Sequence, residues 1–228
     1  MISIDVPTCN EGSGPMELEH FLEQMDGILE VVFVDASDDP KSCKIVDSMK
    51  AGGRSLIVHA DRKGRGAQMN QGARLCRGEA VLFLHCDTRL PSDAAALIEG
   101  ALIERCWGRF DIRLDSTAWR FRLIEFMINL RSRVTRIATG DQAIFVQRRF
   151  FLEHGGFAEI ALMEDIEFCR RIGAIRKPAL ITTPVTTSAR RWISNGTLRT
   201  ILLMWKLRIL YRLGVDPEQL AAMYRTKR

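Results

Sequence analysis

The chain has 228 residues, a length that one α/β domain commonly fills, and 46% of them are hydrophobic. It can therefore bury a sizeable core and does not have the composition of a disordered protein. The formal net charge is +5, with Lys and Arg concentrated after residue 105 and acids frequent in residues 1–61. A basic second half favours phosphate groups, nucleic acid or an anionic membrane surface as partners. Nucleic acid is the weakest of these, because the chain has no recognisable binding motif and only two Tyr.

The first half of the chain alternates strand-like and helical patterns. The predicted strands cover residues 2–7, 31–34, 55–59 and 80–84. The predicted helices cover residues 16–25, 40–50, 66–77 and 93–105. Strands separated by helices at this spacing indicate βαβ units and a mostly parallel sheet.

The second half changes character. Alternating polar and apolar residues predict an edge or mixed strand over 108–114, and a short strand is expected over 143–146. A long arginine-rich helix is predicted over 117–137, and helical patterns recur over 148–154, 164–172 and 198–213. With no repeat and no low-complexity linker, we predict one domain over 1–196. Residues 197–228 would form a basic amphipathic helix and tail, which can pack on the domain, pair with a second copy or lie on an anionic membrane surface.

The cysteines show no CxxC pair and no metal-finger spacing. They are Cys9, Cys43, Cys76, Cys86, Cys106 and Cys169. Several lie in apolar patterns, where a free Cys behaves as a small buried hydrophobe, so we expect reduced thiols and a cytoplasmic protein. We expect no signal peptide, because Met1 leads directly into a strand-like run, and no uncharged apolar stretch is long enough to span a bilayer.

Four short segments carry the candidate chemistry: residues 31–35, 82–88, 140–142 and 163–165. The first two are apolar runs that end at Asp35 and at Asp87. Buried parallel strands open at their carboxyl ends onto the crevice where ligands bind, so two carboxylates there suit a divalent cation and a phosphorylated ligand. Either Asp alone could equally cap the next helix or turn.

A glycine-rich loop precedes the third predicted helix. Gly64 and Gly66 allow the backbone to approach a ligand closely, and Arg65 between them can pair bidentately with phosphate or carboxylate. The N-terminus of the following helix also favours negative charge. A flexible surface loop is the alternative interpretation.

Taken together and in this order, the segments resemble family 2 glycosyltransferases, which have the GT-A fold. More narrowly, the chain looks like a small bacterial branch with a Gly-Arg-x-x-Gln-Met-Asn segment, here residues 64–70, and a Leu-His-x-Asp-Thr motif, here residues 84–88. The resemblance extends from Ile2 to about Tyr224. It implies an α/β fold with a mostly parallel central sheet flanked by helices and a C-terminal amphipathic helix. It also implies a metal-dependent, inverting transfer of a sugar from a nucleoside diphosphate sugar to an acceptor hydroxyl.

The resemblance implies a donor site and a metal ligand. The nucleotide-sugar-binding residues that it implies are Pro7, Glu11, Asp35, Arg65, Asn70 and His85. Asp87 would hold a Mn²⁺ or Mg²⁺ ion that bridges the diphosphate, since hard oxygen ligands suit both ions. His85 replaces the first Asp of the family's usual Asp-x-Asp. Imidazole suits Mn²⁺ better than Mg²⁺, so His85 could ligate the metal or instead hydrogen-bond the ribose or a water.

The resemblance also implies an acceptor site. Glu164 and Asp165 match the family's acidic pair, with Asp165 as the base that takes the proton of the acceptor hydroxyl. Without the resemblance, both acids would fit the N-terminus of a helix equally well. Residues matching the floor of the acceptor pocket are Gly140, Asp141 and Gln142. Arg190, Arg191 and Trp192 match part of an element that closes over the diphosphate, although the usual preceding Gln is absent and a plain basic surface loop is the alternative.

Two other functions stay open. A nucleotidyltransferase would carry a Gly-rich, basic loop after its first strand, but residues 8–14 contain Glu11 and no Lys or Arg. A non-catalytic scaffold that binds a nucleotide or a partner is compatible with His85. The sequence does not identify the donor sugar, the nucleobase, the acceptor or the oligomeric state. The basic helices are compatible with a lipid-linked acceptor, a homodimer, and a peripheral position at the inner face of the membrane.

Overall fold

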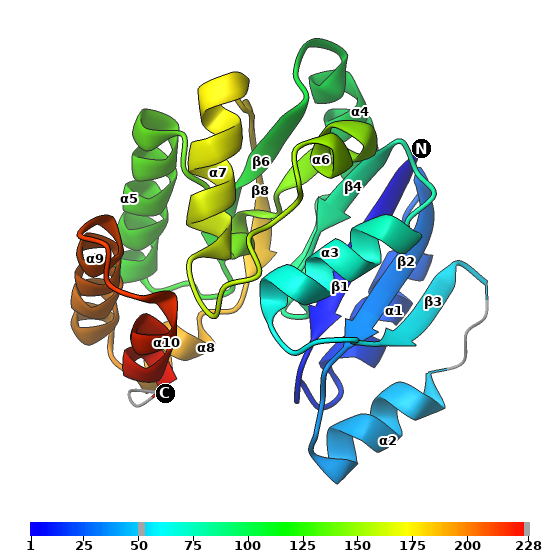
Figure 1. Ribbon diagram of the computed structural model, residues 1–228, viewed down its shortest axis with the longest axis horizontal. Helices are drawn as coiled ribbons and strands as arrows, with labels where there is room; N and C mark the ends of the chain where they lie inside the picture. The colour runs from blue at the N-terminus through cyan, green and yellow to red at the C-terminus, as the bar shows by residue number, and fades with distance from the viewer. Residues whose placement is uncertain (50–52, 226–228) are drawn as a thin grey trace.

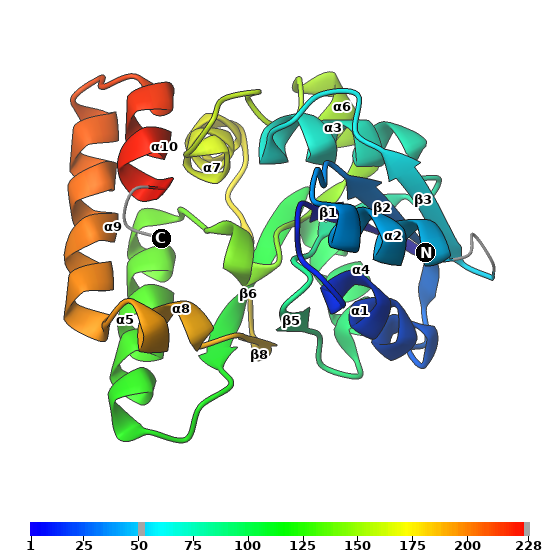
Figure 2. The same ribbon diagram turned by 90° about the horizontal axis from the view of Figure 1, so that it is seen from below.

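A computed structural model of the protein describes residues 1–49 and 53–225. One twisted sheet of eight strands runs through it, with helices on both faces (Figures 1 and 2). The strands are β1 Ile2–Thr8, β2 Ile28–Asp35, β3 Ser55–His59, β4 Ala80–Phe83, β5 Thr88–Arg89, β6 Trp107–Leu114, β7 Phe145–Gln147 and β8 Ala179–Thr187. The helices are α1 Gly14–Glu23, α2 Pro40–Ser48, α3 Arg65–Leu75, α4 Ala94–Glu104, α5 Trp119–Thr135, the 3₁₀ turn η1 Gly140–Gln142, α6 Arg148–Glu153, α7 Glu164–Ile175, α8 Arg190–Ser194, α9 Thr197–Arg212 and α10 Pro217–Arg225.

The strand order is β3-β2-β1-β4-β7-β6-β8-β5. The first four positions are parallel, as the alternation of strands and helices predicts. Strand β7 then runs antiparallel to both β4 and β6, and β6 runs parallel to β8. The expected α/β fold with a mostly parallel central sheet is confirmed, with its mixed region in the second half of the chain.

The two faces of the sheet have separate cores. On one face, alternate residues of β1 such as Ile4 and Val6 pack against Leu18 and Leu22 of α1 and against α4. On the other face, β2 and β4 pack against α3, α6 and α7. Both faces are therefore covered, which explains why these strands read as continuous apolar runs rather than as alternating ones.

The strand over 108–114 was expected at an edge or in a mixed position, and the structure shows that the edge alternative is wrong. Strand β6 lies between β7 and β8 and is almost entirely buried. Of the polar residues that suggested a solvent-facing side, Arg109 and Asp111 form a buried ion pair, whereas Arg113 is exposed.

Helix boundaries follow local chemistry. Asp39 caps α2 by accepting hydrogen bonds from the amides of Lys41 and Ser42, at 3.1 and 2.9 Å, and Pro40 is its first residue, as expected. The predicted end of this helix at Lys50 lies outside the described residues. The short strand expected over 143–146 begins only at Phe145, because Ala143 adopts a left-handed conformation with φ of 46°. The segment 190–194, for which a surface loop was an alternative, is the short helix α8.

All six cysteines are free thiols, three of them buried. Among the described residues, no helix combines the length and the apolarity that a membrane span requires.

Candidate active site

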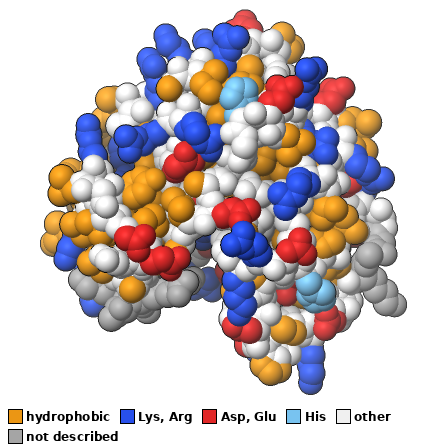
Figure 3. All heavy atoms as spheres, viewed as in Figure 1, with side chains coloured by type: hydrophobic (Ala, Val, Ile, Leu, Met, Phe, Trp, Pro, Cys, Tyr) orange, Lys and Arg blue, Asp and Glu red, His pale blue; other side chains and the backbone are white. Residues whose placement is uncertain are grey.

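A cavity of about 660 Å³ opens where the carboxyl ends of β1 and β4 meet helices from the second half of the chain. Its walls come from the loops after β1 and β4, from η1, from the start of α7 and from α5, α8 and α9. The surface is hollowed between the α10 side of the molecule and the side formed by α2 and α3 (Figure 3). The cavity gathers most of the sequence-predicted site residues. These are Pro7, Glu11, Arg65, His85, Asp87, Gly140, Asp141, Glu164, Asp165, Arg190, Arg191 and Trp192.

The predicted acidic pair begins helix α7. Met163, the residue before the helix, adopts a left-handed conformation with φ of 75°, and this turn directs Glu164 and Asp165 toward the cavity. The Asp165 carboxylate accepts hydrogen bonds from the amides of Gly140, at 2.9 Å, and Ile166, at 2.7 Å. Glu164 lies 3.6 Å from the guanidinium of Arg65. The structure therefore joins three separate motifs: the Gly-Arg loop, η1 and the acidic pair.

The environment shifts the acidity of both carboxyls. Burial and the charge of Asp165 together raise the pKa of Glu164 to about 7, against the opposing effect of the Arg65 guanidinium. Burial also raises the pKa of Asp165, against the opposing effects of Arg65 and the Gly140 amide. Two adjacent carboxyls that titrate above their usual range are suited to exchanging a proton near neutral pH.

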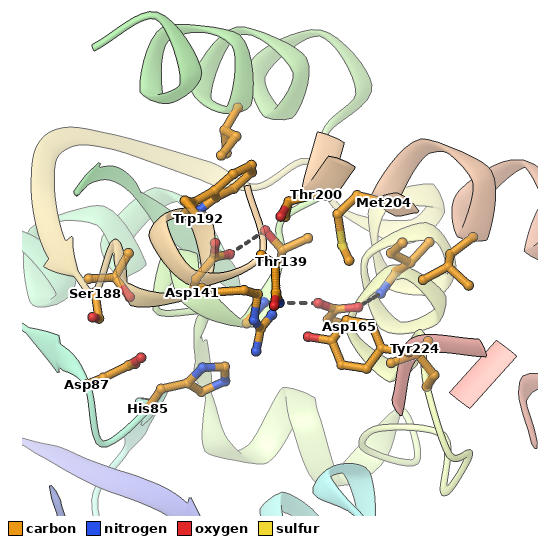
Figure 4. Close-up of a pocket in the computed structure, with 18 of the residues that line it drawn as sticks. His85, Asp87, Thr139, Asp141, Asp165, Ser188, Trp192, Thr200, Met204 and Tyr224 are labelled. Carbon is orange, nitrogen blue, oxygen red and sulfur yellow. Dashed lines mark hydrogen bonds between the residues drawn. The ribbon is translucent and has the colours of Figure 1, made fainter. Parts of the chain in front are cut away.

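His85 and Asp87 lie on the opposite side of the cavity from Asp165 (Figure 4). Burial lowers the pKa of His85 well below its usual value, and the charges of Arg65 and Arg191 lower it further, so the imidazole is neutral at pH 7. The ring packs directly against Gly140, where an added Cβ would lie only 2.7 Å from Nε2. Gly140 thus allows the close approach that was expected of it, and what approaches is the imidazole of His85.

Asp87 is exposed to the cavity, and its carboxylate makes no hydrogen bond or ion pair with any other described residue. No group of three or more His, Cys, Asp or Glu side chains in 1–49 and 53–225 is arranged to hold a metal ion. A free carboxylate beside a neutral imidazole nevertheless fits Mn²⁺ or Mg²⁺ that takes its other ligands from phosphate oxygens and water. The residues present therefore fit a metal that arrives with its nucleotide.

Three predicted site residues do not line the cavity. Asp35 is buried and accepts hydrogen bonds of 2.7 Å from the hydroxyls of Thr8 and Ser37, beside the Pro7–Glu11 loop. Asn70 exchanges two hydrogen bonds with the backbone of Phe157, at 2.9 and 2.8 Å, and so holds the loop before α7.

Gln142 is fully buried. Its side-chain amide oxygen accepts a hydrogen bond of 3.2 Å from the backbone N–H of Thr139. Its side-chain NH₂ group donates a long hydrogen bond to the backbone carbonyl of Phe110. The amide groups of Asn70 and Gln142 are thus engaged in positioning backbone, and the expectation that they contact ligand is not supported by their placement.

The basic element is part of the cavity wall. Arg190, Arg191 and Trp192 lie on α8, and the Arg191 guanidinium stacks over the ring of Tyr224 with 5.2 Å to its centroid. Tyr224 belongs to α10, so this contact links the two C-terminal elements across the cavity.

Sequence reasoning missed several cavity residues, above all Arg131 on α5 and Arg208 on α9. Burial and the charge of Arg208 together lower the pKa of Arg131 to about 10, whereas Asp141 and Asp165 oppose the shift. The arginine-rich patterns of both helices were a signal. Sequence periodicity alone, however, does not show which of many arginines faces inward.

The fold and the cavity define a class of protein: an α/β protein whose crevice lies at the carboxyl ends of the strands. The family model described as glycosyl transferase family 2 matches residues 3–156, and the chain therefore belongs to that family. The family resemblance seen in the motifs is thus confirmed.

Solved structures with the same fold include residues 1–349 of TarS from S. aureus in complex with UDP-GlcNAc, with 18% identity over 82% of this chain and a TM-score of 0.66. The chain spans 58% of the length of that structure. Mannosyltransferase PcManGT from Pyrobaculum calidifontis, in complex with GDP-Man and Mn²⁺, has 20% identity over 99% of this chain and 69% of its own, with a TM-score of 0.65. GalNAc-T7 with UDP, GalNAc and Mn²⁺ has 15% identity over 82% of this chain and 44% of its own, also with a TM-score of 0.65. A search of curated proteins found no match.

Proposed function

We propose that the protein transfers a hexose from a nucleoside diphosphate sugar to an acceptor hydroxyl, with inversion at the anomeric carbon and with a divalent metal. The observation that carries this proposal is the arrangement of one cavity. It holds an acidic pair with raised pKa values, and Arg65, His85 and Asp87 line the same cavity with side chains that suit a diphosphate and its metal. The ligands of the structural neighbours, UDP-GlcNAc and GDP-Man with Mn²⁺, support a donor of this class.

In this reaction Asp165 is the base. The amides of Gly140 and Ile166 hold its carboxylate in place. The acceptor hydroxyl gives its proton to Asp165 while its oxygen bonds to the anomeric carbon, and the bond from that carbon to the diphosphate breaks in line. Glu164 orients Arg65 through their contact of 3.6 Å.

The diphosphate leaves with an extra negative charge, which Arg65 and the arginines of α8 can neutralise. A divalent ion, when bound at Asp87, adds Lewis-acid stabilisation of the same charge. Neutral His85 can hold a ribose hydroxyl or a water, or act as a further metal ligand.

A non-catalytic, nucleotide-binding scaffold is the second candidate, because Asp87 is the one carboxylate at the predicted metal position and His85 stands where a second is usual. Both the transferase and the scaffold would bind a nucleotide, but only the transferase would turn over a sugar donor.

The donor site is tested by thermal unfolding with UDP, GDP, CDP or dTDP, each with and without Mn²⁺. A ligand about 100-fold above its Kd should raise the Tm by roughly 5–10 °C through mass action. Asp87→Ala should abolish the Mn²⁺-dependent part of the shift. Asp93→Ala, an exposed Asp that does not line the cavity, is the matched control and should keep it. No shift with any nucleotide in the unmodified protein would refute the donor site.

The base is tested with Asp165→Asn, measured as transfer to added acceptors or as hydrolysis of the donor identified above. Loss of the proton acceptor should lower turnover by about 10²–10⁴-fold while the nucleotide-induced Tm shift remains. Equal turnover in the variant and the unmodified protein would exclude Asp165 as the base. Complete absence of turnover in the unmodified protein, despite nucleotide binding, would favour the scaffold.

A further inference from the structure

Two cationic side chains beside the proposed base have no partner among the described residues. Arg131 and Arg208 both line the cavity, and neither guanidinium makes a hydrogen bond or an ion pair with another residue in 1–49 or 53–225. One terminal nitrogen of Arg131, Nη2, is fully shielded from solvent as well. The nearest acids, Asp141 and Asp165, act on these arginines through space rather than by direct pairing.

Several other arginines of the protein have direct partners. Arg133, on the same helix as Arg131, pairs with Asp111, and Arg171 pairs with Glu167 and caps two backbone carbonyls. A desolvated guanidinium with open donors is costly unless an anion completes it. The position of Arg131 and Arg208 therefore suits the binding of an anion in the same cavity as Asp165.

The wall next to these arginines is apolar. Helix α5 contributes Ile124, Met127 and Ile128, and α9 contributes Met204 and Trp205. Met127 is 41% exposed and Trp205 is 58% exposed. A sugar acceptor with many hydroxyls would find few hydrogen-bonding partners on this wall.

The apolar wall continues onto the outer surface of both helices. Phe126 and Leu130 on α5 and Leu202 and Ile209 on α9 are each about half exposed or more. Exposed cations, among them Arg133, Lys206 and Arg212, border these residues. An apolar surface with a basic border has the chemistry that complements an anionic lipid.

We infer that the acceptor is an anionic amphiphile, with its negatively charged group bound by Arg131 and Arg208 and its apolar part lying along α5 and α9. This inference rests on the proposed function, since it names the substrate class of the same site. The shared chemistry is a phosphate or carboxylate beside a hydrocarbon chain. The apolar wall distinguishes such an acceptor from a free anion.

The test is a binding titration followed by the emission of Trp192 and Trp205, both of which line the cavity. The probes are dihexanoyl phosphatidic acid, dihexanoyl phosphatidylcholine and inorganic phosphate, each below any micelle concentration. Phosphatidic acid should bind at least tenfold more tightly than either of the others. Binding of phosphate with equal affinity would overturn the amphiphile, and equal binding of phosphatidylcholine would overturn the anion site.

Matched variants locate the two halves of the site. Arg131→Gln should weaken the binding of phosphatidic acid about tenfold or more, whereas Arg105→Gln, at an exposed arginine after α4 and outside the cavity, should not. Met127→Ser should weaken the binding of the lipid but not of phosphate, in contrast to Leu152→Ser, which alters a similarly exposed residue of α6 outside the cavity. Identical affinities within either pair of variants would overturn the corresponding half of the site.

Two further readouts separate failure of this inference from failure of the proposed function. Arg131→Gln removes an unpaired cation, so its Tm without ligand should be no lower than that of the unmodified protein. The Tm shift with the donor nucleotide should also be unchanged in Arg131→Gln. A protein that binds its nucleotide but none of the lipids would keep the donor site and lose only the acceptor assignment.

Discussion

Three buried carboxyls of this protein differ in their hydrogen-bond and charge partners, and their pKa values shift accordingly. Glu30 accepts hydrogen bonds from Ser3 and Arg77, which outweigh the effect of burial and lower its pKa. Glu164 faces the cavity, where Arg65 opposes the effect of burial only in part. Asp5 is fully buried in β1 with no well-formed hydrogen bond to either oxygen, so burial raises its pKa and the nearby amide of Ala73 lowers it only in part. The first carboxyl stabilises the fold, the second serves the site, and the third is a cost to the fold.

The acidic pair gives a pH prediction. Because the pKa of Glu164 is raised to about 7, we expect kcat/KM to fall as the pH drops through about 7, where the pair takes up a proton. Glu164→Gln removes one of the two interacting charges. The fall of kcat/KM on the acidic side of the pH profile, its acidic limb, should therefore move to lower pH. Glu167→Gln, in the same helix but paired with Arg171, should leave the limb in place. A limb that stays put in Glu164→Gln would show that another group controls it.

Glu164 also affects the free energy of unfolding, and its raised pKa determines how this effect changes with pH. The folded state binds this proton more tightly than the unfolded state, so the contribution of Glu164 is fully favourable below its usual pKa. It is lost as the pH rises toward about 7. Urea unfolding of Glu164→Gln between pH 5 and pH 8 should therefore show a gain over the unmodified protein that grows with pH. A gain independent of pH would contradict the raised pKa.

Asp5→Val gives a second stability prediction. Valine is apolar and suits a buried strand position, and it leaves no carboxyl to desolvate against Gly72. We expect a stabilisation of about 1–3 kcal/mol at neutral pH, becoming smaller as the pH falls and Asp5 is protonated without cost. Chemical denaturation at pH 5 and pH 8 measures both values. A destabilised variant would show that the Asp5 oxygens have partners in solution.

The sequence predicted some residues of the cavity and missed others, and the difference has a physical reason. Asp87, Glu164 and Asp165 follow strands or begin a helix, where chain direction alone places them at the crevice. The amide side chains of Asn70 and Gln142 carry no such constraint and bind backbone instead. Arg131 and Arg208 were not found, since helical periodicity leaves the orientation of a helix toward a cavity undetermined.

At the scale of elements, strand β6 is joined to helix α5 by a small charged network. Asp111 pairs with Arg109 on its own strand and with Arg133 on α5. Burial lowers the pKa of Arg109, and two of its nitrogens have no hydrogen-bond partner. This network explains the polar residues that made β6 resemble an edge strand. A sequence pattern cannot tell a polar residue facing water from one paired inside the protein.

Asp111→Ala should leave Arg109 as an uncompensated buried charge and destabilise the protein by about 3–5 kcal/mol. Replacing the pair together, as Arg109→Met with Asp111→Leu, should recover most of that loss, because apolar residues of similar size fill the same space. Urea denaturation of the single and double variants tests this. A double variant no more stable than the single one would indicate that the strand itself needs these charges.

At the scale of the whole molecule, the C-terminal helices complete the cavity. Leu207 of α9 and Leu220 of α10 pack with Met163 and Ile166, on either side of the acidic pair. The sequence predicted α9 as a basic helix but left open what it packs against. The apolar residues of α9 are spaced too irregularly in the sequence to show which face of the helix packs on the protein. The division at residue 196 remains a prediction, and the packing of Leu207 offers a way to test it.

Leu207→Ala should loosen α9 and α10 from the rest of the protein by creating a cavity that costs about 2–5 kcal/mol at this contact. Trypsin should then cleave the arginine-rich helix α9 faster, while the Tm shift with donor nucleotide is retained. Leu202→Ala, at a residue of α9 that is 60% exposed, is the matched control and should not change the cleavage rate. Loss of nucleotide binding in Leu207→Ala would show that residues 197–228 do not form a separable unit.

The cavity draws its walls from both ends of the chain, from Pro7 to Tyr224. On the ribosome, the cavity-lining residues up to Trp192 are therefore made before α9 and α10 exist. Under the proposed function, a chain halted before α9 would leave Asp165 open to bulk water, and water would compete as the acceptor. In that case α9 and α10 are a safeguard against wasteful hydrolysis, because they close the wall of the cavity around the proposed base.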